Sequence, residues 1–589
     1  MSRVTEMVAW SDAALEQRVL ESVSLKVPWS VVEQFSNLVR LSGSADERRA
    51  FEVLTKHLDR WGIPYRLHEP LCFISIPGPA GVRCNGTAYR AKVPAMSPST
   101  GVEGVSGDLV YVRGAAGESV GDVFSTGVEF GGTRVSGKVV LTEGLASPGK
   151  VKDLMSAGAL AGIFVNPGQN IHEGICTTIW GTPDLDSAAR QPTIPVVAVN
   201  HPDGQALIRA AQQGSRATVF TEVETGWRTI PVLVAEIPGR QAPDEFVLLH
   251  GHLDGWHYGV GDNATGDATM LEVARVLWRV RRRLQRTLRV AWWSGHSHGR
   301  YAGSTWYADT YGIDLARSCA AQINCDSPGC RWATTYNHLT AMSETVPFVD
   351  AVIRGTTGIA PDPERPPRAG DYSFNSIGLS SFYMLSSTMS EGDRKEKGYY
   401  AVGGCGGNIA WHTEDDLMEI ADKDNLVRDI RMYAASVLRV LNAPLHPLDW
   451  SRTAAEFRGT LDGYQRAAGD RFDFAPALGA LAALDGALAE FYDGAPARGS
   501  ARTAATKRFN AAQRRLGRLL IPVNYSRMAP FWHDPAINVA PLPDLAPALG
   551  MAPATLDTAQ EAVLRAHLTR GQNRLVWALE QAREVVSRT

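Results

Sequence analysis

A histidine and an aspartate follow an apolar run near the middle of the chain. Phe246–Leu249 is continuously apolar, and His252 and Asp254 come shortly after it. An apolar run that leads into glycines and ionisable residues is typical of a buried parallel strand opening into a site at its carboxyl end. A neutral imidazole is a common metal ligand, and a carboxylate two positions on can orient it. The pattern predicts a metal site in which Asp254 orients His252, although an isolated histidine is more often a core residue.

A glycine-rich segment brings a third ionisable residue to the same region. Asp262 lies within Gly259–Gly266, where glycines allow the backbone to approach closely. A helix with an apolar stripe is predicted directly after this segment. Asp262 therefore joins His252 as a candidate ligand.

The order of these residues resembles the metal-binding core of the co-catalytic zinc exopeptidases. This superfamily includes bacterial aminopeptidases, glutamate carboxypeptidase and the transferrin receptor. The resemblance rests on His252-Leu253-Asp254 and on Gly261–Gly266, and it continues to Asp326, after another apolar segment, and to His412. It implies one or two metal ions, held by His252, Asp262, Asp326 and His412. Histidine and carboxylate ligands suit zinc, with iron or manganese as alternatives.

The chain departs from the family pattern between the second and third of these ligands. The family carries a Glu-Glu pair there, a general base followed by a metal ligand, whereas this chain has His296 and Ser297. Three interpretations stay open. His296 or His298 replaces the missing ligand or base; a single ion acts alone as Lewis acid and water activator; or catalysis is lost and the fold is a binding scaffold.

The first interpretation predicts a metal-dependent hydrolase that cleaves a C–N amide bond with metal-activated water. The bond belongs to a peptide or to a small non-peptide amide. His296 is the base or a substitute ligand, Ser297 positions water or donates to the oxyanion, and Asp254 orients His252.

A serine hydrolase is the alternative from a different class. Gly295–Gly299 reads G-x-S-x-G between a predicted strand and a predicted helix, the context of a nucleophile elbow. Ser297 is then the nucleophile, and Asp326 and His412 complete a triad. This interpretation gives no role to His252 or Asp262, and so short a motif is easily met by chance.

Two other segments have competing interpretations. Gly370–Phe374 resembles a substrate-contacting family segment with Tyr372 in place of a histidine, but Asp371 equally suits a helix cap. His172 could reach the pocket, although a solvated loop is the simpler interpretation of its sequence context.

Composition limits the class of protein. The chain has 589 residues, 44% hydrophobic and 21% charged, with a net charge of −3. This length predicts several domains, and the charge gives no reason to expect a nucleic-acid partner. We find no signal-type or membrane-spanning apolar run, and the seven scattered cysteines suit reduced thiols. These features predict a cytoplasmic protein.

The elements that must position the ligands are expected in an α/β fold. Strands and helices alternate from Pro231 to Leu441, and the resemblance implies a phosphorylase/hydrolase-like α/β sandwich with a mixed sheet. The predicted domains are the N-terminal part of the peptidase-like domain (1–97), a protease-associated-like α/β insertion (98–228), the catalytic domain (229–445) and a helical domain (446–589). The last resembles the dimerisation domain of relatives, which predicts a homodimer.

Overall fold

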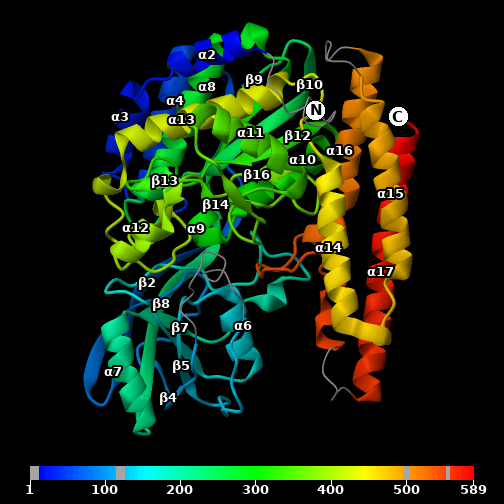
Figure 1. Cartoon of the computed structure of the whole chain (residues 1–589). Coiled ribbons are helices and arrows are strands. Elements are labelled where there is room, and N and C mark those ends of the chain that lie inside the picture. The colour runs from blue at the N-terminus through cyan, green and yellow to red at the C-terminus, as the bar shows by residue number, and fades with distance from the viewer. Residues whose placement is uncertain (1–11, 115–126, 497–502, 552–556) are drawn as a thin grey trace.

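The computed structural model describes residues 12–114, 127–496, 503–551 and 557–589. Figure 1 shows an α/β unit at the top, a β-barrel below it, and a group of long helices that stand along one side of both. No helix in these ranges is both long and apolar enough to cross a membrane.

A mixed sheet of six strands forms the centre of the α/β unit. Its order is β1 (Tyr65–His68), β9 (Val232–Ile237), β11 (Arg286–Trp293), β10 (Ala242–His252), β12 (Cys319–Asn324) and β16 (Ser381–Phe382). The pairs β10/β11, β10/β12 and β12/β16 are parallel, whereas β1/β9 and β9/β11 are antiparallel. The predicted mixed sheet is confirmed.

Side chains alternate between the two faces of this sheet, and each face is covered by helices. In β10, Val247 and Leu249 pack into the larger core, while Phe246 and Leu248 pack into the core on the opposite face. The larger core contains α2 (Ala13–Glu21), α3 (Lys26–Phe35), α4 (Ala45–Trp61), α8 (Thr265–Arg279), α11 (Val346–Thr357) and α13 (Lys423–Asn442); the opposite face is covered by α10 (Ala302–Ser318). Two short sheets, β13 (Ala333–Thr335) with β17 (Thr388–Met389) and β14 (Asn337–Thr340) with β15 (Asp362–Glu364), and the helices α9 (His296–Gly299) and α12 (Glu391–Glu396) complete the unit.

The inserted domain is a closed barrel. Its strand order is β2 (Leu71–Cys84), β3 (Thr87–Lys92), β7 (Val196–Val199), β6 (Ala161–Val165), β5 (Val139–Glu143), β4 (Val105–Tyr111) and β8 (Arg216–Thr229), with α6 (Pro148–Ser156) and α7 (His201–Gln212) beside it. The predicted start at residue 98 is wrong, because β2 pairs with β8 from Leu71↔Thr229 to Cys84↔Ala217. Local strand patterns do not reveal which sheet a strand joins when its partner lies far along the chain.

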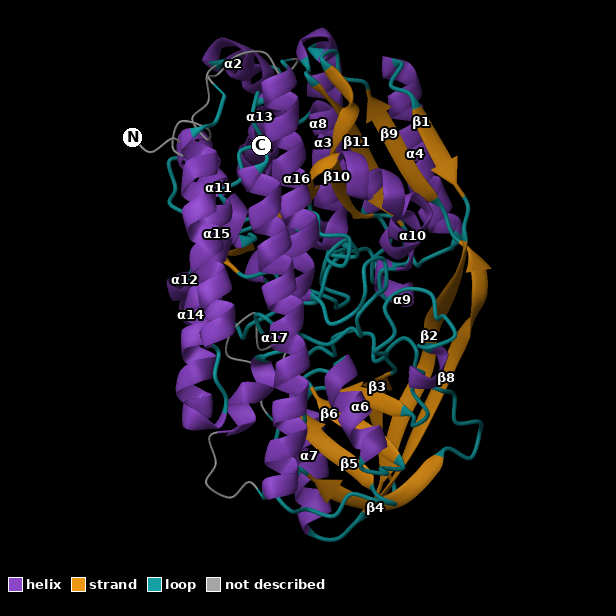
Figure 2. Cartoon of the chain, turned by 90° about the vertical axis from the view of Figure 1, so that its right-hand side faces the viewer, coloured by secondary structure: helices purple, strands orange, loops and turns teal. Residues whose placement is uncertain are grey.

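The C-terminal unit consists of four long helices. They are α14 (Trp450–Ala468), α15 (Ala475–Asp493), α16 (Ala504–Tyr525) and α17 (Thr558–Ser587), and Figure 2 shows them side by side. They share one apolar core, which includes Phe457 and Leu575. Arg518 of α16 fixes this unit to the α/β unit by donating to the carbonyls of Cys319 (2.7 Å) and Gly378 (2.8 Å).

Candidate metal centre

Three parallel neighbours in the sheet place side chains at one edge. His252 is the last residue of β10, His296 begins α9 just beyond β11, and Asp326 lies just beyond β12. Because the carboxyl ends of parallel strands meet at one edge, these side chains converge. One ligand atom from each lies within 4.8 Å of the others. The rings of His252 and His296 are stacked, with their centroids 3.7 Å apart.

Asp262 lies between two of the predicted histidines. Its Oδ1 is 3.0 Å from Nε2 of His252, and its Oδ2 is 3.0 Å from Nε2 of His412. Nε2 of His252 is also 3.5 Å from Oδ2 of Asp326. The structure therefore brings together all four residues predicted as ligands. Burial would raise the pKa of Asp262, but the two adjacent imidazoles lower it well below its usual value, so the carboxylate keeps its charge.

The loop that carries Asp262 is fixed on both sides. The Asp416 carboxylate accepts from the backbone N–H groups of Gly261 (2.7 Å) and Asp262 (3.0 Å). The amide of Asn263 donates to the carbonyls of His252 (3.2 Å) and Cys325 (2.9 Å), which ties the ends of β10 and β12 together. Arg40 adds a clamp from the N-terminal segment, since it donates to the carbonyls of the loop after β10.

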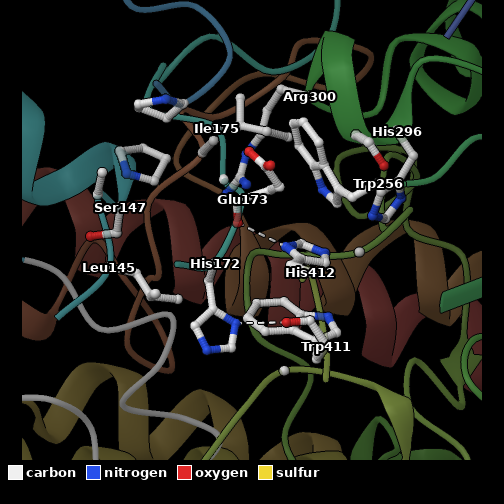
Figure 3. A pocket seen from close by; sticks show the side chains of 18 of the residues that line it. Leu145, Ser147, His172, Glu173, Ile175, Trp256, His296, Arg300, Trp411 and His412 are labelled. Atoms are coloured by element: carbon white, nitrogen blue, oxygen red, sulfur yellow. Dashed lines mark hydrogen bonds between the residues drawn. The ribbon is translucent and has the colours of Figure 1, made fainter. Parts of the chain in front are cut away.

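His412 is held by a loop of the inserted domain. Its Nδ1 is 3.1 Å from the backbone oxygen of Glu173, and the Glu173 N–H donates to the His412 carbonyl at 2.8 Å (Figure 3). His172 is buried, with Nδ1 at 2.6 Å from the carbonyl of Trp411 and Nε2 at 2.7 Å from the hydroxyl of Tyr400. Of the two interpretations of His172, the solvated loop is wrong, because the residue is buried and lines the pocket. The inserted domain therefore helps to place the fourth candidate ligand.

His296 has a carboxylate partner behind it. Its Nδ1 is 2.9 Å from Oδ2 of Asp371, which is buried and also accepts from the Ser304 hydroxyl at 2.7 Å. Burial would raise the pKa of Asp371, but the adjacent His296 lowers it. A carboxylate on one nitrogen fixes the tautomer and the orientation of a histidine whose other nitrogen binds a metal or a proton. The sequence left Asp371 undecided between a helix cap and a site residue; its contacts here are those of a site residue.

The predicted role of Asp254 needs correction. Nδ1 of His252 contacts the backbone oxygen of Asp254 at 2.7 Å, not the carboxylate. The carboxylate instead accepts from the backbone N–H of Ser297 (2.8 Å) and of His296 (3.1 Å) and from the Ser42 hydroxyl (2.7 Å). Asp254 therefore positions the turn that carries His296.

His298 and Ser297 are less well placed for the roles considered from the sequence. His298 is fully buried, with Nδ1 at 2.9 Å from the hydroxyl of Ser42, and it does not line the pocket. Ser297 lines the pocket, but its Oγ has no hydrogen-bond partner among the described residues. Both ring nitrogens of His412 contact other groups, so the structure gives no support to a triad of Ser297, Asp326 and His412.

The residues present fit a zinc site. Nε2 of His252 and Oδ1 of Asp262 are buried and lack a hydrogen-bond partner among the described residues, although they face each other. Buried polar atoms normally have partners, and atoms that converge in this way are typical of a metal site. The cluster opens into a pocket that all three units line, with Trp256, Tyr301 and Asn538 among its walls.

Comparison with known proteins agrees with the fold and the site. Residues 233–437 match peptidase family M28, and residues 105–207 match the PA domain. Bovine carboxypeptidase Q is 25% identical over 290 residues, which cover 46% of this chain and 57% of that protein. Mouse aminopeptidase NAALADL1 is 28% identical over 152 residues, 24% of this chain and 19% of that protein. The chain thus spans little more than half the length of carboxypeptidase Q and about a fifth of the length of NAALADL1.

Solved structures show the same fold. The zinc aminopeptidase BSAP of Bacillus subtilis superposes with a TM-score of 0.53 at 20% identity, covering 71% of this chain and 96% of that one. An aminopeptidase of Aneurinibacillus sp. strain AM-1 gives 0.52 at 17% identity, covering 72% and 96%. Fold and site together define a zinc exopeptidase superfamily chain with an inserted PA domain. Within that likeness, residues 233–437 are the part of the chain that matches peptidase family M28.

Proposed function

We propose that the protein is a metal-dependent hydrolase that cleaves the C–N bond of a peptide or small amide with water. The observation that carries this proposal is the position of Asp262 at 3.0 Å from Nε2 of both His252 and His412, with Asp326 beside them. In this proposal these four residues hold zinc. Zinc bound there would polarise the scissile carbonyl and lower the pKa of water. The family match supports a peptide substrate.

His296 takes the place of the first family glutamate in this proposal. Its Nδ1 faces the Asp371 carboxylate, so the proton stays on Nδ1 and Nε2 is free to accept one. An imidazole in this state either accepts a proton from water and passes it to the leaving amine, or serves as a ligand. His252 stacks on His296 and limits where its ring can lie.

Metal analysis of the purified protein, followed by chelation, tests the proposal. We expect one or two zinc ions per chain, hydrolysis of a panel of dipeptides, aminoacyl anilides and N-acyl amino acids, loss of activity with a chelator, and recovery on adding zinc. Two ions favour His296 as substitute ligand, and one favours His296 as base. Full activity in the chelated protein, with inhibition by a serine-directed phosphonate, would instead favour Ser297 as nucleophile. A zinc-loaded protein that hydrolyses none of the panel would favour the scaffold interpretation.

We further propose a homodimer in the cytoplasm. Trp577 and Val563 on α17 are 60% and 70% exposed, which supports an apolar contact surface on the helical unit. All seven cysteines are free and buried, which suits a reducing compartment. Sedimentation as a monomer at micromolar concentration would contradict the dimer.

A further inference from the structure

Arg300 is a largely buried arginine whose enclosed Nε has no partner among the described residues. The residue is 9% exposed, and its guanidinium makes no hydrogen bond or ion pair with any residue that the structure describes. Its side chain instead lies near the ring of Tyr301, with 4.9 Å between Cζ and the centroid. Arginine is almost never buried without a partner, because removing the charge from water is costly unless another group compensates. A side chain kept in this state points to a ligand that supplies the missing acceptor.

Arg368 is a second buried arginine in the same pocket, and its described partners are carbonyl groups, not carboxylates. It is 6% exposed and donates to the carbonyls of Tyr372 (3.2 Å) and Asp534 (2.9 Å), but its Nε has no partner among the described residues. Its guanidinium lies 3.6 Å from the ring of Trp180. Within the described ranges, no carboxylate comes within 4.0 Å of either guanidinium. Burial lowers the pKa of Arg368 to about 10, so the group stays charged at neutral pH.

The two arginines lie on the side of the pocket near His296. Both line the pocket that contains the metal cluster, and Figure 3 shows Arg300 and His296 in the upper part of the view, above His412. Tyr301 lies beside both Arg300 and His296. Its ring centroid is 4.9 Å from Cζ of Arg300 and 4.8 Å from the ring centroid of His296. The ring of Tyr301 therefore lies in contact with both Arg300 and His296 of the metal cluster.

The acidic residues of the pocket do not offset these charges. Asp262 and Asp326 belong to the metal cluster. Glu173 is already paired with Lys92 (3.1 Å) and His257 (3.0 Å). Asp534 acts on Arg368 from further away and raises its pKa, but its carboxylate accepts from the Ser526 hydroxyl and the Arg527 N–H. Among the described residues, neither arginine thus has a carboxylate in direct contact, beside a site proposed to hydrolyse amides.

We propose that Arg300 and Arg368 bind a carboxylate of the substrate, so that the enzyme acts on small peptides or acylated amino acids with a free carboxylate close to the scissile bond. This inference rests on the proposed hydrolase function. The planar fork of a guanidinium matches the two oxygens of a carboxylate. The carboxylate comes either from a C-terminus or from an acidic side chain, and the single ring of Tyr301 between Arg300 and His296 favours the C-terminus.

Three matched substrates test this proposal on the zinc-loaded protein. They are a neutral dipeptide with a free C-terminus, the same dipeptide as its C-terminal amide, and an amidated dipeptide whose second residue is acidic. We expect kcat/KM to be at least about tenfold higher for the free C-terminus than for the amide, mainly through KM, as one charge-assisted pair would give. Preference for the acidic amidated dipeptide would assign the arginines to a side-chain carboxylate. Equal rates for all three would overturn the proposal.

Substitutions assign the preference to these residues. Arg300→Gln and Arg368→Gln should each reduce the ratio between free acid and amide by about tenfold or more, whereas Arg300→Lys should keep part of it. Arg331→Gln is the matched control, because Arg331 is an exposed arginine over the ring of Trp332 outside this pocket. A ratio that is unchanged in both Arg300→Gln and Arg368→Gln would contradict the proposal.

Two measurements separate this inference from the proposed function. Calorimetry with the free amino acid product measures carboxylate binding without turnover: binding to the wild type but not to Arg300→Gln supports the inference even if no substrate is cleaved, and absence of binding and of cleavage overturns both. Thermal unfolding without ligand gives a second readout. Arg300→Met should unfold at a higher temperature than the wild type, since it removes an uncompensated buried charge; a lower temperature would mean that Arg300 has a structural partner.

Discussion

The metal centre and the junction between the α/β unit and the helical unit both bury carboxylates, but they treat the charge in opposite ways. At the metal centre, burial alone would raise the pKa of Asp262, yet the imidazoles of His252 and His412 lower it well below its usual value. At the junction, burial raises the pKa of Glu344 to about 7. Oε2 of Glu344 accepts from the hydroxyl of Thr453 at 3.2 Å, and no basic group of the described residues lies within 4.0 Å.

The comparison shows that burial does not by itself decide whether an acid is charged. Asp262 and Glu344 are 5% and 2% exposed, so they differ little in solvent contact. They differ in partners, because one faces two imidazoles and the other faces a hydroxyl. A cluster that keeps its carboxylates charged is suited to hold a cation. The following substitutions test that distinction, from the largest expected effect on activity to the smallest.

Asp262→Asn should have the largest effect. It removes the charge between the two histidines, so we expect lower zinc content and a loss of kcat/KM on the order of 10³- to 10⁴-fold. Asp267→Asn is the matched control, since Asp267 is also buried but neither of its carboxylate oxygens has a described partner, and burial raises its pKa. Metal content and kinetics are measured on both. If Asp262→Asn kept its zinc and its activity, the cluster would not be the catalytic site.

His296→Gln should have the next largest effect. Loss of a general base costs about 10²- to 10⁴-fold in kcat, and loss of a ligand also lowers zinc content. His338→Gln is the control, because His338 makes a similar contact with a carboxylate, Glu364 at 2.5 Å, on the exposed surface. Full activity of His296→Gln beside an equally active control would remove His296 from the mechanism.

Asp371→Asn should have a smaller effect than His296→Gln. The asparagine keeps the size of the side chain but no longer offers a charged acceptor to Nδ1 of His296. Loss of such a partner costs about 10- to 100-fold in activity or metal affinity. Glu364→Gln is the control, and rates of both variants are compared across pH. A loss in Asp371→Asn larger than in His296→Gln would show that Asp371 acts on the substrate directly and not through His296.

The four predicted ligands could be named because three of them have local signals and a family resemblance supplied the fourth, His412. His252, Asp262 and Asp326 each follow an apolar or glycine-rich segment in the order that the resemblance requires, and the structure brings these three together with His412. Their supporting groups were not predictable in the same way. Asp371 and Asp416 reach the site through contacts between segments far apart in the chain, and no local pattern marks such contacts.

The domain boundary was missed for a related reason. The strand patterns before and after residue 71 look alike, and only the pairing of β2 with β8 assigns that segment to the barrel. The environment of Arg300 and Arg368 could not be predicted from the sequence either. In the sequence they are two arginines among many basic residues, and their lack of a carboxylate partner is visible only in the fold. Strand partners and ion-pair partners both depend on three-dimensional packing, which a local sequence pattern does not record.

Glu344→Gln should change stability and leave activity almost unaltered. The folded pKa of about 7 lies above the ordinary value of 4.5, so the folded protein binds the extra proton. The wild-type contribution is therefore fully present below pH 4.5 and is lost as pH rises through 7. Glutamine removes this dependence, and at pH 8 the variant should be more stable by about 3 kcal/mol, measured by denaturant unfolding at pH 5 and pH 8. Glu456→Gln is the control, because Glu456 is paired with Arg365 at 2.8 Å and should gain nothing at high pH. An identical pH dependence in wild type and Glu344→Gln would mean that Glu344 keeps its charge, and the contrast with Asp262 would then fail.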